Sequence, residues 1–266
     1  MRNSGNDSAN PNPSEIDVAR RLRRSLSRAA LVSAAVCILS TCASAPSSGA
    51  LCPYRGMEAA RAAPTDEELK VVDSSKQLIG MAPNAKALVK GKQFTLDCIG
   101  TVCAIYYRLG IDLAKDFDEY PGNGVNRLYL SLKDKGVIHY DRYPRPGDIV
   151  FWDNTYDANG DGDRTDDPHT HAGIVLAVDD DGTIRYVHEN LYKGVIIETM
   201  NLLRPTVAFD DSGKRLNSGM AIATVSGGPK PERNLAGDVF DSFGDALKVK
   251  GDFEAAELDA KLALIR

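Results

Sequence analysis

Long hydrophobic runs are missing from this 266-residue sequence, and so are the patterns that mark several other protein classes. No apolar run approaches the ~20 residues of a transmembrane helix, which excludes a multispanning membrane protein. No Cys-x-x-Cys pair occurs, which excludes a zinc ribbon and a thioredoxin-type motif. The net charge is −5 without a long basic patch in the body of the chain, so we expect no nucleic-acid partner. A hydrophobic content of 43% excludes wholesale disorder.

The N-terminal segment has the pattern of an export signal. Five arginines between residues 20 and 28 precede a short apolar stretch, Ala29 to Leu39, which is too short to span a bilayer. The following Leu39-Ser40-Thr41-Cys42 resembles the lipobox of bacterial lipoproteins, in which the cysteine is lipidated. Cleavage at Ala43-Ser44-Ala45 is the alternative. We therefore expect residues 1–41 to be a signal peptide and Cys42 to carry lipid. The protein is then exported to the periplasm or cell envelope, with membrane contact through that anchor at most.

The rest of the chain is expected to form one α+β domain between a tether and a tail. Residues 42–64 are rich in Ala, Ser, Pro and Gly and are typical of a flexible tether. A capping box formed by Thr65 and Glu68 starts the first helix, and further helices are expected over 98–110 and 125–135. Short β-branched segments then predict antiparallel strands, so residues 65–226 should place N-terminal helices on an antiparallel sheet. The expected strands are 148–152, 171–178, 184–189, 194–200 and 220–225.

Residues 227–266 are predicted to be a linker and a helical tail. The tail contains two sets of apolar residues at helical spacing. The first set is Val239, Phe240, Phe243 and Leu247, and the second is Leu258, Leu262 and Ile265.

The cysteines indicate a free and reactive thiol. Once Cys37 leaves with the signal and Cys42 carries lipid, an odd number remains, namely Cys52, Cys98 and Cys103. Cys98 lies in Asp-Cys-Ile-Gly at the predicted start of a helix, whose dipole favours a thiolate. Gly100 would leave room for a substrate backbone. Cys103 has no chemical neighbours and is expected to be a core residue.

Two histidines have the spacing of a base and its partner. His171 opens the predicted strand His-Ala-Gly-Ile-Val, and His188 ends the strand expected to face it, which can bring the two rings together. Glu189 or Asn190 could orient His171 instead of His188. His139 and His169 are expected to be loop residues. Zinc bound by His169, His171 and nearby carboxylates is the alternative, since residues i and i+2 share a strand face.

These motifs, in this order, resemble the NlpC-type cell-wall cysteine peptidases, which are papain-like and related to CHAP amidases. The resemblance spans about residues 65–200 and rests on Asp-Cys-Ile-Gly at 97–100, Pro-Arg-Pro-Gly-Asp-Ile-Val-Phe-Trp at 144–152, His-Ala-Gly-Ile-Val at 171–175 and Val-His-Glu-Asn at 187–190. It implies a papain-like fold, with Cys98 as nucleophile, His171 as base and His188 as the orienting residue. It also implies that the protein is a cysteine peptidase or amidase whose substrates are peptidoglycan stem peptides. No cofactor is expected for catalysis.

Two other functions remain open at this point. A non-catalytic envelope binding protein could use the same scaffold, although the presence of Cys98, His171 and His188 together argues against it. A papain-like hydrolase or acyltransferase acting on another amide or ester would use the same thiol and base.

An acidic loop between the strand that ends at Trp152 and the strand that begins at His171 predicts a structural calcium site. Its run Asp-Ala-Asn-Gly-Asp-Gly is similar to an EF-hand loop, in which alternate side-chain oxygens surround one cation. Without the cation the crowded carboxylates repel each other. The expected ligands are Asp157, Asn159, Asp161, Asp163 and Asp167.

Overall fold

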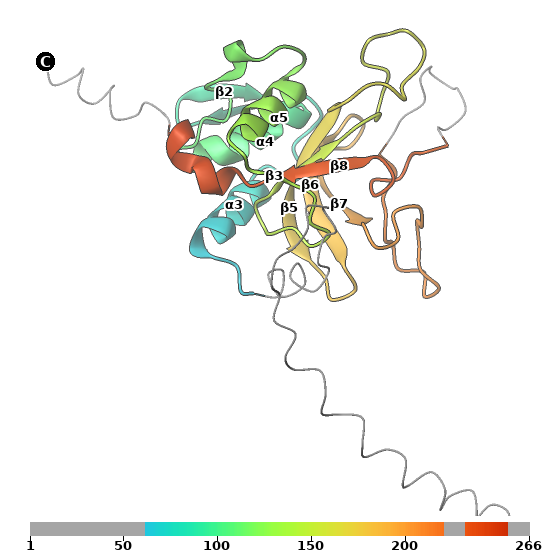
Figure 1. Cartoon of the computed structure of the whole chain (residues 1–266). Coiled ribbons are helices and arrows are strands. Elements are labelled where there is room, and N and C mark those ends of the chain that lie inside the picture. The colour runs from blue at the N-terminus through green and yellow to red at the C-terminus, as the bar shows by residue number, and fades with distance from the viewer. Residues whose placement is uncertain (1–61, 221–231, 255–266) are drawn as a thin grey trace, which may run out of the picture. The chain divides into compact units, whose positions relative to one another are not determined.

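The structure, a computed structural model, describes residues 62–220 and 232–254. The predicted signal peptide, Cys42, Cys52, most of the tether and the second apolar set of the tail lie outside these residues, as does nearly all of the strand expected over 220–225. Figure 1 shows the arrangement of the elements. The helices are α3 (Asp66–Lys76), α4 (Cys98–Arg108) and α5 (Gly124–Asp134), with 3₁₀ helices η1 (Phe117–Glu119) and η2 (Ala246–Phe253). The strands are β1 (Lys86–Val89), β2 (Lys92–Thr95), β3 (Ile138–His139), β4 (Ile149–Trp152), β5 (His171–Val178), β6 (Thr183–Asn190), β7 (Gly194–Asn201) and β8 (Phe240–Gly244).

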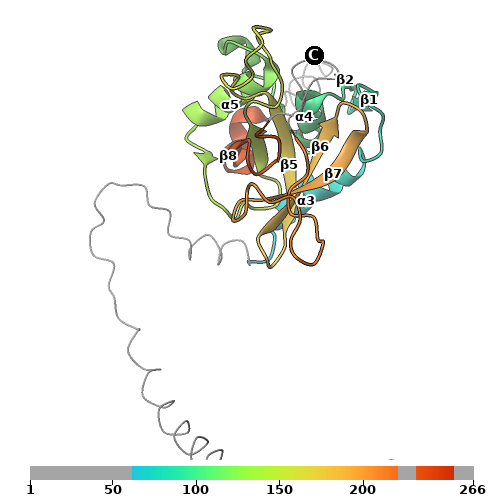
Figure 2. The same cartoon turned by 90° about the vertical axis from the view of Figure 1, so that its right-hand side faces the viewer.

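The described residues form two antiparallel sheets, which confirms the predicted α+β class. The large sheet has six strands in the order β3-β8-β4-β5-β6-β7, and β1 and β2 form a separate hairpin. Strands β4 to β7 follow each other in sequence and in space. Figure 2 shows β5, β6 and β7. The predicted strand at 171–178 has those bounds in the structure, and the strands expected at 184–189 and 194–200 are one residue longer at one or both ends.

The two faces of the large sheet bury different sets of side chains, because neighbouring residues of a strand point to opposite faces. Phe151 and Ile174 face the helices and share a core with α4 and α5. Val150, Trp152 and Tyr186 point to the opposite face and pack with residues that follow β7. Both faces of β4 are therefore buried, which explains its uninterrupted apolar sequence Ile-Val-Phe-Trp.

The first helix is held to the sheet by a charged contact. Its predicted capping box is confirmed, because Thr65 and Glu68 exchange side-chain to backbone hydrogen bonds. Glu68 also accepts two hydrogen bonds from the Arg145 guanidinium, at 2.8 and 2.7 Å. Arg145 belongs to the motif at residues 144–152. This part of the motif therefore fixes α3 beside β4 and lies outside the cavity described below.

The helix predicted around Phe240 and Phe243 is wrong. These residues lie in β8, which inserts between β3 and β4 and pairs Phe243 with Val150. A short apolar segment fits helical and extended spacing equally well, and here the open edge of β4 supplies backbone partners that a helix would not use. The sheet thus includes residues beyond the domain boundary predicted at residue 226.

Within residues 62–220 and 232–254, no helix is both long enough and apolar enough to cross a bilayer.

Candidate active site

Cys98 is the first residue of α4, and Asp97 caps the helix in front of it. The Oδ1 atom of Asp97 accepts a hydrogen bond from the backbone N–H of Gly100 at 2.7 Å. A Cβ atom built on Gly100 would lie 1.8 Å from the carbonyl oxygen of Thr95. The predicted role of Gly100 is therefore wrong, because the space beside its Cα is filled by the end of β2. The glycine is needed so that α4 can begin close against that strand.

Cys98 is a neutral thiol at neutral pH in this structure. Burial first, and then the negative charge of Asp97, raise its pKa to about 12, although backbone N–H groups at Ile99 and Ala172 act in the opposite direction. The thiolate expected from the helix dipole is therefore not the resting state. A base must take the proton when the sulfur reacts.

His171 is the first residue of β5. Cys98 and His171 line the same cavity. The backbone N–H of Ala172, the residue after His171, interacts with that sulfur. Burial and the neighbouring His188 hold the pKa of His171 well below its ordinary value. His171 is therefore uncharged at neutral pH and able to accept a proton.

His188 contacts His171 across a glycine. His171 Nε2 lies 2.8 Å from His188 Nδ1, and His188 is almost fully buried. The two residues lie on neighbouring strands, with Gly173 between them on the sheet surface. A Cβ atom on Gly173 would lie 2.7 Å from the Val187 carbonyl oxygen and 3.2 Å from His188 Cβ. The glycine of the motif at 171–175 thus lets β5 lie close against the β6 backbone at His188.

Glu198, which the sequence analysis did not identify, continues this row onto β7. Its Oε2 lies 3.2 Å from His188 Nε2, and its Oε1 lies 3.4 Å from Lys193 Nζ. Burial alone would raise the pKa of Glu198, but contacts with His188 and Lys193 lower it. In the β6–β7 register His188 faces Ile196, so Glu198 is its diagonal neighbour on the same face. The one feature of the sequence that could have identified Glu198 is a carboxylate within a mostly apolar predicted strand.

The row from Glu198 to His171 favours one tautomer for each ring. If a neutral His188 directs its Nε2 hydrogen at the Glu198 carboxylate, 3.2 Å away, it accepts through Nδ1. His171 then donates from Nε2, and its Nδ1 atom holds the free lone pair. Nδ1 of His171 is thus the nitrogen left to deprotonate Cys98.

The alternatives to His188 have other positions. Asn190 Oδ1 accepts hydrogen bonds from the backbone N–H groups of Tyr192 and Lys193 at 3.0 and 3.2 Å, and so shapes the turn between β6 and β7. Burial and the negative charge of Asp97 raise the pKa of Glu189. Among the described residues, His188 is the one that contacts the His171 ring nitrogens by a hydrogen bond. Cys103 is buried in the helix-side core.

The cavity that joins these groups has a volume of about 320 Å³ and is large enough for a short peptide segment. Tyr156 and Tyr192 line it, and Tyr192 is 78% exposed. Leu191 adds an exposed apolar contact beside Tyr192. The reacting groups therefore lie at the inner wall, and an aromatic and apolar rim is available to hold a ligand.

The acidic loop folds through its own side chains. Oxygens of Asp157, Asn159, Asp161 and Asp163 each accept a backbone N–H within the loop, at 2.7 to 2.9 Å. Asp167 is buried. Among the described residues, the group of His, Cys, Asp or Glu side chains close enough to share one ion lies elsewhere, at Asp153, His169 and Asp241. Calcium at the loop stays a prediction.

The fold and the cavity define an α+β protein with a partly exposed cysteine and two histidines at one site, and one comparison agrees with this class. Residues 89–190 match the CHAP domain family. The match contains Cys98, His171 and His188 and ends before Glu198. It confirms the resemblance to papain-like cell-wall peptidases and amidases of the CHAP and NlpC type. CHAP domains are typically hydrolases that act on peptidoglycan. No curated protein and no solved structure gives a significant match to the chain.

Proposed function

We propose that this protein is a papain-like cysteine hydrolase that cleaves peptide or amide bonds in peptidoglycan stem peptides. The observation that carries the proposal is the 2.8 Å contact between His171 Nε2 and His188 Nδ1 beside Cys98 in one cavity. It leaves Nδ1 as the free ring nitrogen of His171, in the cavity that Cys98 also lines. The CHAP match supplies the substrate class.

The reaction follows from these positions. His171 Nδ1 takes the Cys98 proton while the sulfur attacks the carbonyl carbon of the scissile bond. The tetrahedral intermediate collapses when His171 returns the proton to the leaving amine, and a thioester remains on Cys98. Water then attacks the thioester and gives its proton to His171, and the acid product leaves as Cys98 regains its proton.

His188 and Glu198 are positioning residues in this scheme. Protonated His171 carries a positive charge during each step, and its Nε2–H points at His188. Glu198 sets the His188 tautomer and places a negative charge at the far end of the row. A carboxylate in this position stabilises a transient imidazolium without taking its proton.

We also propose export with lipidation at Cys42, which keeps the protein at the cell envelope, where its substrate lies. The residues concerned lie outside the described part of the chain. Mass analysis of the protein purified from bacterial membranes tests the proposal. A mature chain that begins at Cys42 with acyl groups supports it, and a chain cleaved after Ala45 or uncleaved overturns it.

The activity is tested with purified peptidoglycan and mass analysis of the released fragments. New amino termini within the stem peptide indicate a peptidase, and release of whole stem peptides indicates an amidase. The matched inactive control is Cys98→Ala. If the wild-type protein binds peptidoglycan and releases nothing, it is a binding protein on this scaffold. If it cleaves only simple esters or other amides, the substrate class is wrong.

A further inference from the structure

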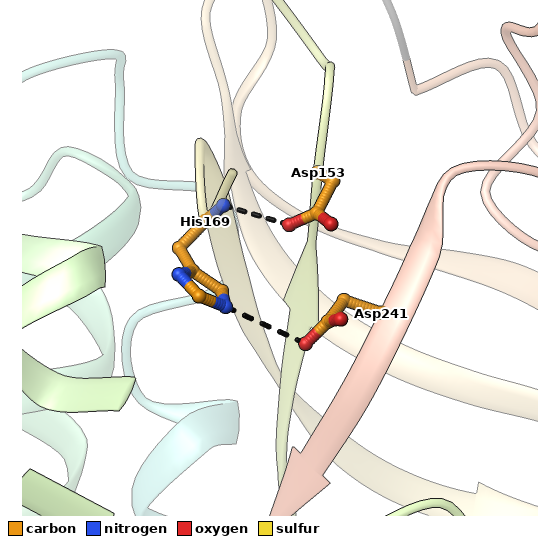
Figure 3. Close-up of side chains that lie close together, drawn as sticks. All are labelled: Asp153, His169 and Asp241. Carbon is orange, nitrogen blue, oxygen red and sulfur yellow. Dashed lines mark hydrogen bonds and ion pairs between the residues drawn. The ribbon is translucent and has the colours of Figure 1, made fainter. Parts of the chain in front are cut away.

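Three side chains that the proposed reaction does not use meet near the start of β5. Asp153 follows β4 directly, His169 precedes β5, and Asp241 lies on β8 (Figure 3). One ligand atom from each lies within 4.8 Å of the others. His169 Nε2 is 3.6 Å from Asp241 Oδ2, and Asp153 Oδ1 accepts the backbone N–H of His169 at 2.7 Å. Three separate chain segments thus converge on one point.

The neighbours of His169 fix which ring nitrogen faces the carboxylates. The Nδ2 group of Asn126 donates to the Pro121 carbonyl at 3.0 Å, so the Asn126 amide oxygen must face the other way. That oxygen lies 2.8 Å from His169 Nδ1 and can only accept. Nδ1 therefore carries a hydrogen, and Nε2 of the ring faces Asp241. Tyr129 stacks on the ring with centroids 3.6 Å apart and locks its orientation.

Two carboxylates and one imidazole nitrogen meet at the centre of this arrangement. Oδ2 of Asp241 is closed off from solvent and accepts no hydrogen bond from the described residues. Of the two cations whose charge acts on these carboxylates, Arg233 also pairs with Asp238 at 3.0 Å, and Lys133 Nζ lies 5.7 Å from the Tyr129 ring centroid. Two carboxylates and a nitrogen lone pair repel one another unless a cation lies between them.

We propose that Asp153, His169 and Asp241 bind one divalent metal ion, with Zn²⁺ as the preferred ion. One imidazole nitrogen and two carboxylate oxygens are a donor set that Zn²⁺ accepts, and water completes its coordination. Asn126 has the role of an outer-shell residue that fixes the tautomer of a ligating histidine. The sequence analysis gave zinc bound by His169, His171 and nearby carboxylates as an alternative. The site proposed here includes His169 but not His171, whose Nε2 faces His188.

Such an ion would join the ends of β4, β5 and β8 at one point. His171 is two residues after His169, so the ion would hold the entry of the strand that carries this histidine. Its role would be structural, since the three ligands are separate from the row of His171, His188 and Glu198. The proposal is therefore independent of the proposed hydrolysis.

The test uses the full chain, stripped with a chelator and titrated with ZnCl₂ in a calorimeter. We expect one equivalent to bind, with 10- to 100-fold weaker affinity in Asp241→Asn and in His169→Gln. The melting temperature of the wild-type protein should rise by about 5 °C or more in excess Zn²⁺. Asp161→Asn is the matched control, because it alters the acidic loop alone and should bind Zn²⁺ as the wild type does.

Cobalt gives a second readout that needs no variant. Co²⁺ bound in place of Zn²⁺ should absorb in the visible range with the weak bands of nitrogen and oxygen ligands, and excess Zn²⁺ should abolish them. Absence of stoichiometric binding to the wild-type protein overturns the proposal. Binding that survives in folded Asp241→Asn but is lost in Asp161→Asn also overturns it, and assigns the ion to the acidic loop instead.

Discussion

His188 Nε2 lies 3.2 Å from Glu198 Oε2, so a carboxylate faces the His188 nitrogen that does not contact His171. We predict that Glu198→Gln lowers kcat on the order of 10- to 100-fold with little change in KM. The amide keeps the shape of the side chain but removes the charge that sets the His188 tautomer. Steady-state kinetics on peptidoglycan fragments measure the effect.

Lys193→Gln is the matched control for this prediction, because Lys193 contacts the same carboxylate at 3.4 Å from the solvent side. It should retain nearly full activity. If Glu198→Gln is folded and as active as the wild type, Glu198 has no part in positioning His188. If both variants lose activity equally, the charge balance of β7 matters rather than the His188 contact.

The second prediction concerns the reactivity of Cys98 as a resting thiol. Because its pKa is raised to about 12, alkylation by iodoacetamide at pH 7 should be much slower than that of a free cysteine and should rise steadily up to pH 10. Asp97→Asn removes a nearby negative charge but keeps a helix-capping side chain. It should therefore speed alkylation by ~3- to 10-fold.

Mass analysis of the labelled peptide distinguishes Cys98 from Cys103. Cys98→Ala should abolish both the labelling and the hydrolysis. Cys103→Ala should keep both at a loss of ~1 kcal/mol in the free energy of unfolding, since Cys103 is buried in the core. Fast labelling of Cys98 at pH 7 would show that the thiolate is the resting state after all. If alkylation of Cys103 abolishes hydrolysis, Cys103 is the nucleophile and the assignment of Cys98 is wrong.

The third prediction tests the space between the two histidines. Gly173→Ala places a Cβ atom 2.7 Å from the Val187 carbonyl oxygen, a contact that a rigid strand cannot relieve cheaply. We expect the free energy of unfolding to fall by ~1–3 kcal/mol and activity to fall at least tenfold as His188 moves. Gly251→Ala is the control, because nothing lies within 4 Å of its added Cβ. A fully active Gly173→Ala protein would contradict this account of the glycine.

The sequence predicted those elements whose signals are local. The helix at Cys98 follows from apolar spacing within one segment, and the strand at His171 follows from β-branched residues between turns. The approach of His188 to His171 could also be expected, because consecutive antiparallel strands are neighbours. Spacing alone did not choose between His188, Glu189 and Asn190 as the partner of His171.

The features that the sequence did not predict depend on distant partners. Strand β8 forms because β4, about 90 residues earlier in the chain, offers an open edge. The apolar residues of β8 also fit helical spacing, so the sequence predicted a helix there. Glu198 became visible only once the β6–β7 register placed it diagonally from His188. The protonation state of the Cys98 thiol depends on burial, which a sequence motif does not show. Burial raises the pKa of this thiol more than the backbone N–H groups at the start of the helix lower it.

The fourth prediction concerns calcium and the acidic loop. If Asp157, Asn159, Asp161, Asp163 and Asp167 surround one ion, the melting temperature should rise with calcium, with a dissociation constant of about 10⁻⁴–10⁻³ M. Melting curves and hydrolysis rates across calcium concentrations measure this, with Asp161→Ala as control. An unchanged melting temperature rejects the site. A shift without a change in rate keeps the ion but rejects any coupling of the loop to the strand of His171.

The last prediction uses pH to measure the contact between Glu68 and Arg145. Burial would raise the pKa of Glu68, but Arg145 and Thr65 lower it below its ordinary value of 4.5. The folded state therefore binds fewer protons than the unfolded state, so the contact stabilises above pH 4.5 and is lost as the pH falls through the folded pKa. Glu68→Gln should reduce the free energy of unfolding by ~1–3 kcal/mol at pH 7, and the difference should shrink as the pH falls below 4.5 and through the lowered folded pKa. Urea unfolding at several pH values tests this, with the half-exposed neighbour Glu67→Gln as the control expected to change stability little. A difference for Glu68→Gln that is equal at pH 7 and pH 3.5 would show that packing, and not the ion pair, holds α3 to the sheet.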